Sequence, residues 1–387
     1  MPVAQTEPVA APLADPELDL LERFKPVLRF DRQYDYRAAS VQGVVENPGN
    51  VLTTGHAEVI ARAGGEPRLT LELLSAYPDG GEPKDDDQIC LAPNVLGDAR
   101  AMETRPEHGG RLYGRVCEDG GRRWLQYWFW LYFNPKHLMG FGKHEGDWEM
   151  IQIGLGPDGE PELVGYAQHE SGEARKAEKV EWVESDRGRH PVVYVAPYSH
   201  AAYFEPGAHP YVLGVDHPTR GGPSDLLPVE RFGPWVEWCG HWGSSERVIA
   251  GRIGNGPRSP SKQGWKWEHP ARFQLRLRSR WIRVQLGRLM HLVGRLTFPK
   301  PPRVTARLEG RACVVAYELA DRRSRHLYLT VHEGRRVVAS RRVRCAEQSG
   351  EERIRLETPP AEPLVCGSTF NRLRQRSEVA EAPVEGG

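Results

Sequence analysis

The chain has 387 residues, of which 39% are hydrophobic and 27% are charged, and its formal net charge at pH 7 is zero. This length predicts two domains rather than one, and the zero net charge argues against a protein devoted to binding nucleic acid. No apolar run approaches the roughly 18 residues that a membrane-spanning helix needs. Residues 1–19 are rich in Pro and Ala and lack the basic and apolar regions of a secretory signal, so we expect a disordered tail there.

Residues 20–264 consist of short apolar runs separated by Gly, Pro, Asp and Asn. This spacing is typical of a β-sandwich or jelly roll, so we expect a mainly β domain. Strands are predicted at "KPVLRFD", "RLYGRVCED", "ELVGYAQHE" and "HPVVYVAPYSHAAYF". The run "RWLQYWFWLYFNP" at 123–135 is apolar at nearly every position, and a strand buried on both faces belongs at the centre of such a fold.

The candidate site lies in "HEGDWE", which begins at His144 and leads into the next apolar run. Successive residues of a strand point to opposite faces, so Asp147 and Glu149 share a face and Trp148 points away from them. Gly146 permits a tight backbone approach or a positive φ. One imidazole and two carboxylates therefore converge, and the repulsion between the carboxylates requires either a protonated acid or a bound cation.

A divalent cation is the simpler solution at neutral pH, and the oxygen-rich set of His144, Asp147 and Glu149 predicts Mg²⁺ or Ca²⁺ as a metal ligated by these residues. The alternative is a surface turn in which His144, Lys143 and Arg side chains pair with the acids. If the site is catalytic, its candidates for proton transfer are His144, Glu149 and His200. No serine elbow, Cys/His arrangement, phosphate loop or dinucleotide fingerprint competes with it.

Two further segments are expected to contribute ligand-binding residues. His169 and Glu170 end one predicted strand, and His200 lies in a turn after another; a His200 that bonds only to the backbone of its turn is the alternative. The stretch "GPWVEWCGHWG" contains Trp235 and His241. Tryptophans beside a polar pocket suit sugars and other ring-containing ligands, although such a cluster more often forms a core or a lid.

The stretch 265–300 is rich in Arg and holds a single acid, Glu268. From about Arg280 its apolar residues recur at helical spacing, which predicts a basic amphipathic connecting helix. Its apolar stripe either packs on the sandwich or lies on an anionic membrane or an acidic partner. Residues 301–378 form a regular series of predicted strands, typical of a small fibronectin- or immunoglobulin-like β-sandwich. Residues 379–387 are expected to be a disordered tail.

Four ordered blocks resemble the vacuolar protein sorting-associated protein sixty-two family. They are "FKPVLRFDRQYDYRAASV", "LQYWFWLYFNPKHLMGFGK" followed by "HEGDWE", "YAQHESGE" and "HPVVYVAPYSHAAYFEPG", and they lie within about residues 20–260. The family looks distantly similar to the necrosis- and ethylene-inducing peptide-like proteins, whose signature is Gly-His-Arg-His-Asp-Trp-Glu. The resemblance implies a β-sandwich in which the signature His, Asp and Glu surround a divalent cation and help engage sphingolipid glycans at membranes. The segment "VCGSTFNRLRQRSEV" resembles the last strand of a fibronectin type III-like domain.

Carried over by position, the first signature His, the Asp and the Glu fall on His144, Asp147 and Glu149. The sequence departs from the signature at two places. The second signature His is Gly146 here, and the upstream metal-binding Asp falls near Lys136, where Asn134 and His137 are the alternatives for its place.

Three functions remain open. The first is divalent-cation-dependent binding of a small polar molecule, a glycan or a lipid headgroup, with the C-terminal domain orienting the site. The second is a metal-assisted hydrolase or lyase that uses the same residues. The third is a peripheral membrane protein that docks through the basic residues 272–300. The six scattered cysteines form no C-x-x-C pair and indicate reduced thiols in a cytoplasmic protein.

Overall fold

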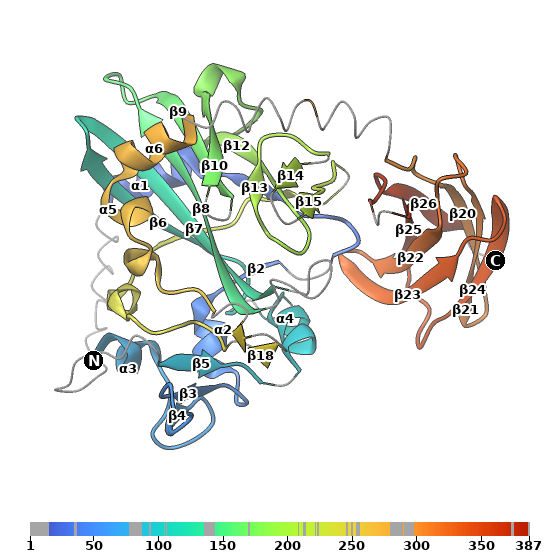
Figure 1. Ribbon diagram of the computed structural model, residues 1–387, viewed down its shortest axis with the longest axis horizontal. Helices are drawn as coiled ribbons and strands as arrows, with labels where there is room; N and C mark the ends of the chain where they lie inside the picture. Colours follow the sequence, from blue (N-terminus) through green and yellow to red (C-terminus); the bar gives the residue numbers. More distant parts are fainter. Residues whose placement is uncertain are drawn as a thin grey trace, which may run out of the picture.

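The protein is mainly β, as predicted, with two large sheets and several small ones in the N-terminal domain and a separate sheet in the C-terminal domain (Figure 1). The computed structural model describes residues 15–34, 37–76, 87–92, 94–103, 105, 107–134, 144–168, 171–207, 209–211, 214–220, 222, 224–244, 247–248, 251–252, 256–278, 289, 298–372 and 375–385. The predicted site residues His169 and Glu170 therefore lie outside the described residues, as does most of 279–297.

The larger N-terminal sheet has the strand order β10-β9-β8-β7-β6-β17, and β2 also pairs with β7. Its strands are β2 (Ala38–Ala39), β6 (Leu112–Asp119), β7 (Arg122–Asn134), β8 (His144–Leu155), β9 (Pro161–Gln168), β10 (Ser171–Lys176) and β17 (Val229–Arg231). Every residue of β7 from Trp124 to Asn134 is buried. The central place predicted for this apolar strand is confirmed, because β7 pairs with β6 on one side and β8 on the other.

The two faces of this sheet bury different cores. One face carries an aromatic cluster that includes Trp128, Trp130, Trp148, Trp235, Trp238 and Trp242. The other face packs against the second sheet through apolar side chains that include Leu125, Phe129, Ile151, Ile153, Val193 and Val195. Since side chains alternate along β8, Asp147 and Glu149 belong to the face that meets the second sheet.

The second sheet has the order β11-β12-β1-β16, and β13 pairs with β12. Its strands are β1 (Val27–Arg29), β11 (Trp182–Ser185), β12 (Gly188–Val195), β13 (Ala202–Tyr203) and β16 (Ser224–Asp225). The two facing sheets, with one apolar core between them, make the predicted β-sandwich. Strand β13 lies against β8 and β9, which brings the turn between β12 and β13 to the start of β8.

The prediction of a disordered tail over residues 1–19 is wrong at its end, because helix α1 (Pro16–Phe24) begins within it. The carboxylate of Asp15 accepts hydrogen bonds from the backbone N–H groups of Glu17 and Leu18, and Pro16 occupies the first helical position. The helix buries Leu21 and Phe24 in the core between the sheets.

Short elements complete the N-terminal domain. They are β3 (Val51–Thr53), β4 (Val59–Arg62), β5 (Gln88–Cys90), β14 (His209–Tyr211), β15 (Gly214–Asp216), β18 (Arg247–Val248), β19 (Gly251–Arg252), α2 (Val41–Glu46), α3 (Leu71–Ala76), α4 (Val95–Glu103), and the 3₁₀ segments η2 (Ala177–Lys179), η3 (Pro234–Glu237) and η4 (Pro260–Lys262). Strands β3, β4 and β5 form a small sheet, and β14–β15 and β18–β19 form two-stranded sheets.

The described part of the basic connecting segment forms α5 (Trp265–Glu268) and α6 (Pro270–Arg278). Helix α6 packs on the larger sheet, because Phe273, Gln274 and Leu277 are buried against it. The apolar stripe predicted from about Arg280 lies mostly outside the described residues, so its packing stays a prediction. In the described part of the chain, no helix is both long and apolar enough to cross a bilayer.

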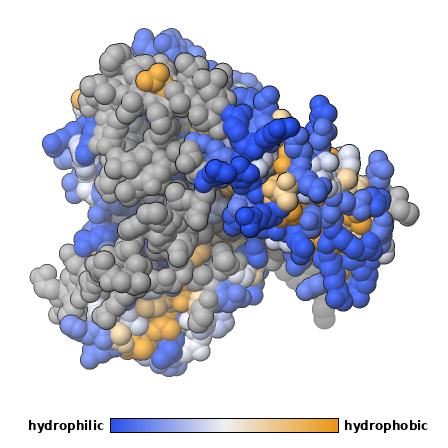
Figure 2. Space-filling model, turned by 45° about the vertical axis from the view of Figure 1, so that its right-hand side comes forward, coloured by the Kyte–Doolittle hydropathy of each residue, from blue (hydrophilic) through white to orange (hydrophobic). Residues whose placement is uncertain are grey.

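The C-terminal domain is a seven-stranded sheet with the order β23-β22-β25-β26-β20-β21-β24. Its strands are β20 (Arg303–Glu309), β21 (Ala312–Glu318), β22 (His326–Glu333), β23 (Arg336–Arg344), β24 (Ser349–Arg355), β25 (Pro363–Phe370) and β26 (Ala380–Glu385). It encloses its own apolar core, and the face of the domain seen in Figure 2 is largely hydrophilic. The fibronectin type III resemblance stays a prediction.

The tail predicted over residues 379–387 is also wrong, because β26 pairs antiparallel with β25 and parallel with β20. The strand satisfies the backbone groups that two sheet edges would otherwise expose. None of the six described cysteines forms a disulfide.

Candidate polar site at the start of strand β8

The HEGDWE motif forms the first residues of β8, and Gly146 determines how the strand begins. Gly146 has a φ of +66°, and a side chain there would meet the ring of Trp130 and the carbonyl oxygen of Trp242, each at 2.1 Å. Only glycine therefore fits.

Asp147 is the centre of a hydrogen-bond network. His200 Nδ1 lies 3.0 Å from Asp147 Oδ2, and Asn134 Nδ2 donates to the same oxygen at 3.4 Å. Asn134 Nδ2 also lies 3.1 Å from His144 Nε2, and His144 Nδ1 lies 2.6 Å from the carbonyl oxygen of Gly146. Because a carbonyl only accepts, His144 carries its proton on Nδ1, and its Nε2 accepts from Asn134.

His200 reaches Asp147 from the turn between β12 and β13. Both Tyr198 (φ +74°) and His200 (φ +57°) adopt left-handed backbone conformations, which cost a residue with a side chain about 1–2 kcal/mol each. The backbone N–H of His200 donates to the carbonyl of Ala196 at 3.1 Å, and only 3% of His200 is exposed. The surrounding structure therefore holds a strained turn that delivers an imidazole to a carboxylate.

Glu149 lies two residues beyond Asp147 on the same face and is 6% exposed. Burial raises the pKa of Glu149 well above its usual range, the nearby Asp147 raises it further, and Lys266 opposes the shift. No hydrogen bond to its carboxyl group is formed among the described residues. Burial and the repulsion between the two acids thus both favour the protonated form of Glu149.

A third buried acid, Asp216 of β15, belongs to the same surroundings and was missed by the sequence analysis. It is 1% exposed and accepts a hydrogen bond of 2.7 Å from the hydroxyl of Tyr203. Its charge also raises the pKa of Glu149. The only signal in the sequence was an acid at the end of a short apolar run, which no motif distinguishes from an ordinary turn residue.

The fourth ionisable group of the motif, Glu145, joins two loops. Its carboxylate accepts hydrogen bonds of 2.8 Å from the backbone N–H groups of Leu91 and Ser244. Such charge-assisted bonds fix the loops against the start of β8. Glu145 therefore has a structural role that the spacing of the motif did not reveal.

Trp235 and His241 make their contacts outside the Asp147 hydrogen-bond network. Trp235 is stacked on Trp148 with 6.1 Å between ring centroids, so it belongs to the aromatic core on the opposite face of the sheet. It also lines a surface pocket of about 450 Å³ that contains none of the residues of the Asp147 network. His241 Nδ1 lies 2.6 Å from the carbonyl oxygen of Gly256. Trp235 therefore lies on the face of the sheet opposite Asp147, and the His241 imidazole is held by a backbone carbonyl.

Asp147 and Glu149 offer the oxygen donors that a hard cation prefers. His144, by contrast, uses both of its ring nitrogens in contacts with other groups of the protein. Among the residues that the structure describes, no three His, Cys, Asp or Glu side chains are arranged to hold a metal ion. The two nitrogens of His144 face the Gly146 carbonyl and the Asn134 amide, so His144 would have to exchange Asn134 for an ion. Within the described residues, the structure thus assembles two adjacent carboxyls and a carboxylate-bound imidazole.

The fold and the site define a β-sandwich protein with buried acids and a histidine at the start of a central strand. Residues 131–221 match the family model for vacuolar protein sorting-associated protein 62. This segment contains Asp147, Glu149, His200 and Asp216, and the match confirms the family resemblance predicted from the sequence.

Several similar solved structures are necrosis- and ethylene-inducing proteins, as the resemblance implied. NLPPya in complex with glucosamine is 13% identical, with a TM-score of 0.33 over 66% of this chain and 90% of that chain. Necrosis and ethylene inducing protein 2 from the causal agent of cocoa's witches' broom disease is 13% identical, with a TM-score of 0.27 over 61% of this chain and 81% of that chain. Likeness at this level carries no conclusion about ligands. No curated protein matches the sequence.

Proposed function

We propose that the N-terminal domain binds a polar ligand at Asp147 and Glu149 with the help of a divalent cation, Mg²⁺ or Ca²⁺. The observation that carries the proposal is the buried Glu149 carboxyl, which lies beside Asp147 and receives no hydrogen bond from the described residues. A proton or a cation must balance such a pair. Hard divalent cations prefer carboxylate oxygens and keep positions for other oxygens, which suits the hydroxyls of a glycan, a lipid headgroup or another small polar molecule.

The test is the shift in melting temperature when Mg²⁺ or Ca²⁺ is added to chelator-treated protein. An ion present at a hundred times its Kd stabilises the folded state by about 2.7 kcal/mol. We expect a shift in the wild type and none in Asp147→Asn. Asp186→Asn, the same substitution in the turn between β11 and β12, serves as the control and should retain the shift. A wild-type protein that responds to neither ion would overturn the proposal.

A second candidate is a metal-assisted hydrolase or lyase at the same site, favoured by the hydrogen bond between His200 and Asp147. A carboxylate that orients an imidazole is a common arrangement for general acid–base catalysis. His200 would move the proton, and a bound cation would supply Lewis-acid activation. Turnover of esters, phosphoesters or glycosides that disappears with chelator and in His200→Gln would favour this candidate; no turnover on any class leaves ligand binding preferred.

A further inference from the structure

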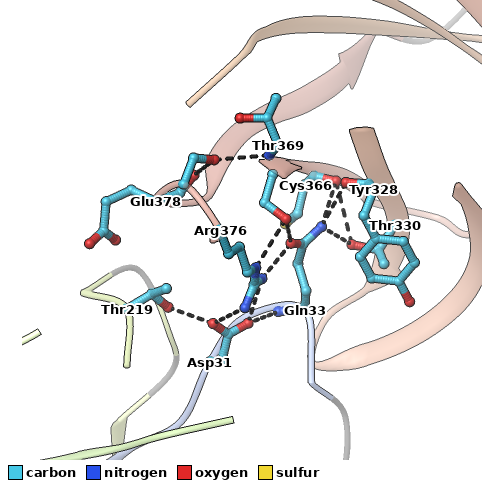
Figure 3. Close-up of polar contacts among 11 residues, drawn as sticks. Asp31, Gln33, Thr219, Tyr328, Thr330, Cys366, Thr369, Arg376 and Glu378 are labelled. Atoms are coloured by element: carbon cyan, nitrogen blue, oxygen red, sulfur yellow. Dashed lines mark hydrogen bonds and ion pairs between the residues drawn. The ribbon is translucent and has the colours of Figure 1, made fainter. Parts of the chain in front are cut away.

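A buried polar network joins the two domains, and we call its residues, Asp31, Gln33, Thr219, Ser368 and Arg376, the interdomain latch. All of them except Ser368 are labelled in Figure 3. Arg376 of the C-terminal domain donates two hydrogen bonds to Asp31 of the N-terminal domain, at 2.8 and 3.0 Å. Both side chains are almost completely buried. A buried bidentate pair of this kind tolerates no shift of one partner, since either charge alone would be buried without compensation.

Gln33 fixes the loop after β1 to the C-terminal sheet. Its Nε2 donates to the carbonyl oxygens of Tyr328 and Cys366, at 3.1 and 3.2 Å. Its Oε1 accepts from Ser368 Oγ at 2.6 Å and from Arg376 at 2.5 Å. Polar groups that are satisfied on both sides specify one docked arrangement of the domains.

The latch continues toward the candidate site through an aromatic contact. Tyr34, next to Gln33, meets Tyr198 edge-to-face with 4.7 Å between ring centroids. Burial raises the pKa of Tyr198, and Arg376 is close enough to lower it. Tyr198 is the first of the two left-handed residues in the strained turn, and His200 is the second. Such a turn persists only where neighbouring structure holds it.

The same Asp31 carboxylate anchors a second segment of the site. Thr219 Oγ1 donates to Asp31 Oδ2 at 2.9 Å, on the side of the carboxylate that faces away from Gln33 (Figure 3). Thr219 follows three residues after Asp216, whose charge acts on Glu149. The Asp31 carboxylate therefore binds the segment that carries Asp216. It also belongs to the loop that supports the turn of His200.

We infer that the interdomain latch positions His200 on Asp147, so that the docked C-terminal domain is part of the functional unit. The inference depends on the proposed function only for the identity of the ligand that the site binds. Docking holds the loop of residues 31–34, this loop supports Tyr198, and the supported turn presents the imidazole of His200. Release of the latch frees the turn, and His200 leaves Asp147.

The test uses NMR of the full-length, ion-free protein and follows the low-field proton of an imidazole N–H bonded to a carboxylate. The loss of this resonance in His200→Gln and in Asp147→Asn assigns it. We expect Arg376→Gln to abolish it or to increase its exchange with water at least tenfold, and Arg376→Lys to restore it in part. Glu381→Gln is the matched control, because it removes the interdomain Arg32–Glu381 ion pair of 3.1 Å and leaves the latch intact.

A second variant covers the case in which Arg376→Gln fails to fold. Tyr34→Ala removes the contact with Tyr198 and leaves the Asp31–Arg376 pair, and we expect the same loss of the resonance. If the resonance is unchanged in folded Tyr34→Ala or in folded Arg376→Gln, the inference is overturned. The C-terminal domain then plays no part in positioning His200. The measurement needs no ligand, so its failure is distinguishable from a failure of Mg²⁺ or Ca²⁺ to bind the wild type.

Discussion

Replacing Gly146 by alanine should damage the start of β8 more than an ordinary glycine substitution damages a turn. The new Cβ would lie 2.1 Å from both the Trp130 ring and the carbonyl oxygen of Trp242. The φ of +66° costs an alanine about 1–2 kcal/mol, and overpacking of a close-packed core adds about 1–3 kcal/mol. The expected loss in the free energy of unfolding is therefore about 2–5 kcal/mol.

Gly159→Ala provides a matched control for the backbone part of this cost. Gly159 also has a positive φ, +80°, but nothing lies within 4 Å of a Cβ added there. It should lose only about 1–2 kcal/mol. The difference between the two variants thus isolates the steric contact with Trp130 and Trp242.

Urea unfolding followed by tryptophan fluorescence is the suitable assay, because all 11 tryptophans precede residue 300 and report on the N-terminal domain. The two variants should be compared at equal m-values, so that a change in midpoint reflects stability. If Gly146→Ala unfolds within about 0.5 kcal/mol of Gly159→Ala, the strand can move away from Trp242, and the steric reason for glycine in the motif is incorrect.

Three further predictions address the latch, the buried acid and the basic segment. Arg376→Gln should cost about 3–5 kcal/mol, because it leaves Asp31 buried and unpaired, whereas the more exposed Arg335→Gln should cost about 1 kcal/mol or less; urea unfolding followed by circular dichroism measures both. The pKa of Glu149 is raised in the folded state, so its contribution to stability is lost as pH rises above the usual glutamate range. In ion-free protein, the free energy of unfolding of Glu149→Gln should therefore increase relative to that of the wild type as pH rises. Parallel stability–pH curves for the two proteins would contradict the raised pKa. Neutralising the arginines of 276–283 should reduce sedimentation with anionic liposomes if this stretch docks on membranes, and a wild type that does not sediment would dismiss that function.

Local physics explains why much of the sandwich was predictable. The strands β6, β7, β9 and β12 are apolar runs bounded by turn-forming residues, and such runs favour strands wherever they occur. The strict alternation of side chains along a strand places Asp147 and Glu149 on one face from their spacing alone. Burial of the run at 123–135 on both faces likewise required a central position.

The ends of the chain show where composition misled. The Pro- and Ala-rich start predicted disorder, but Asp15 and Pro16 cap the N-terminus of a helix, which therefore begins within the predicted tail. Ala380–Glu385 has no apolar side chain larger than that of Val384, yet it becomes a strand because β20 and β25 offer unpaired edges. The availability of an edge is a property of the assembled sheet and is invisible in the segment itself.

The sequence by itself determined the strands, the central place of β7 and the shared face of the two acids, because each follows from spacing within one segment. Only the tertiary structure decided that His200 reaches Asp147, that Asp216 acts on Glu149, and that Arg376 locks onto Asp31. These partners come from different segments of the chain. Which segments meet depends on how the sheets are ordered and packed, and periodicity along the chain does not encode that order.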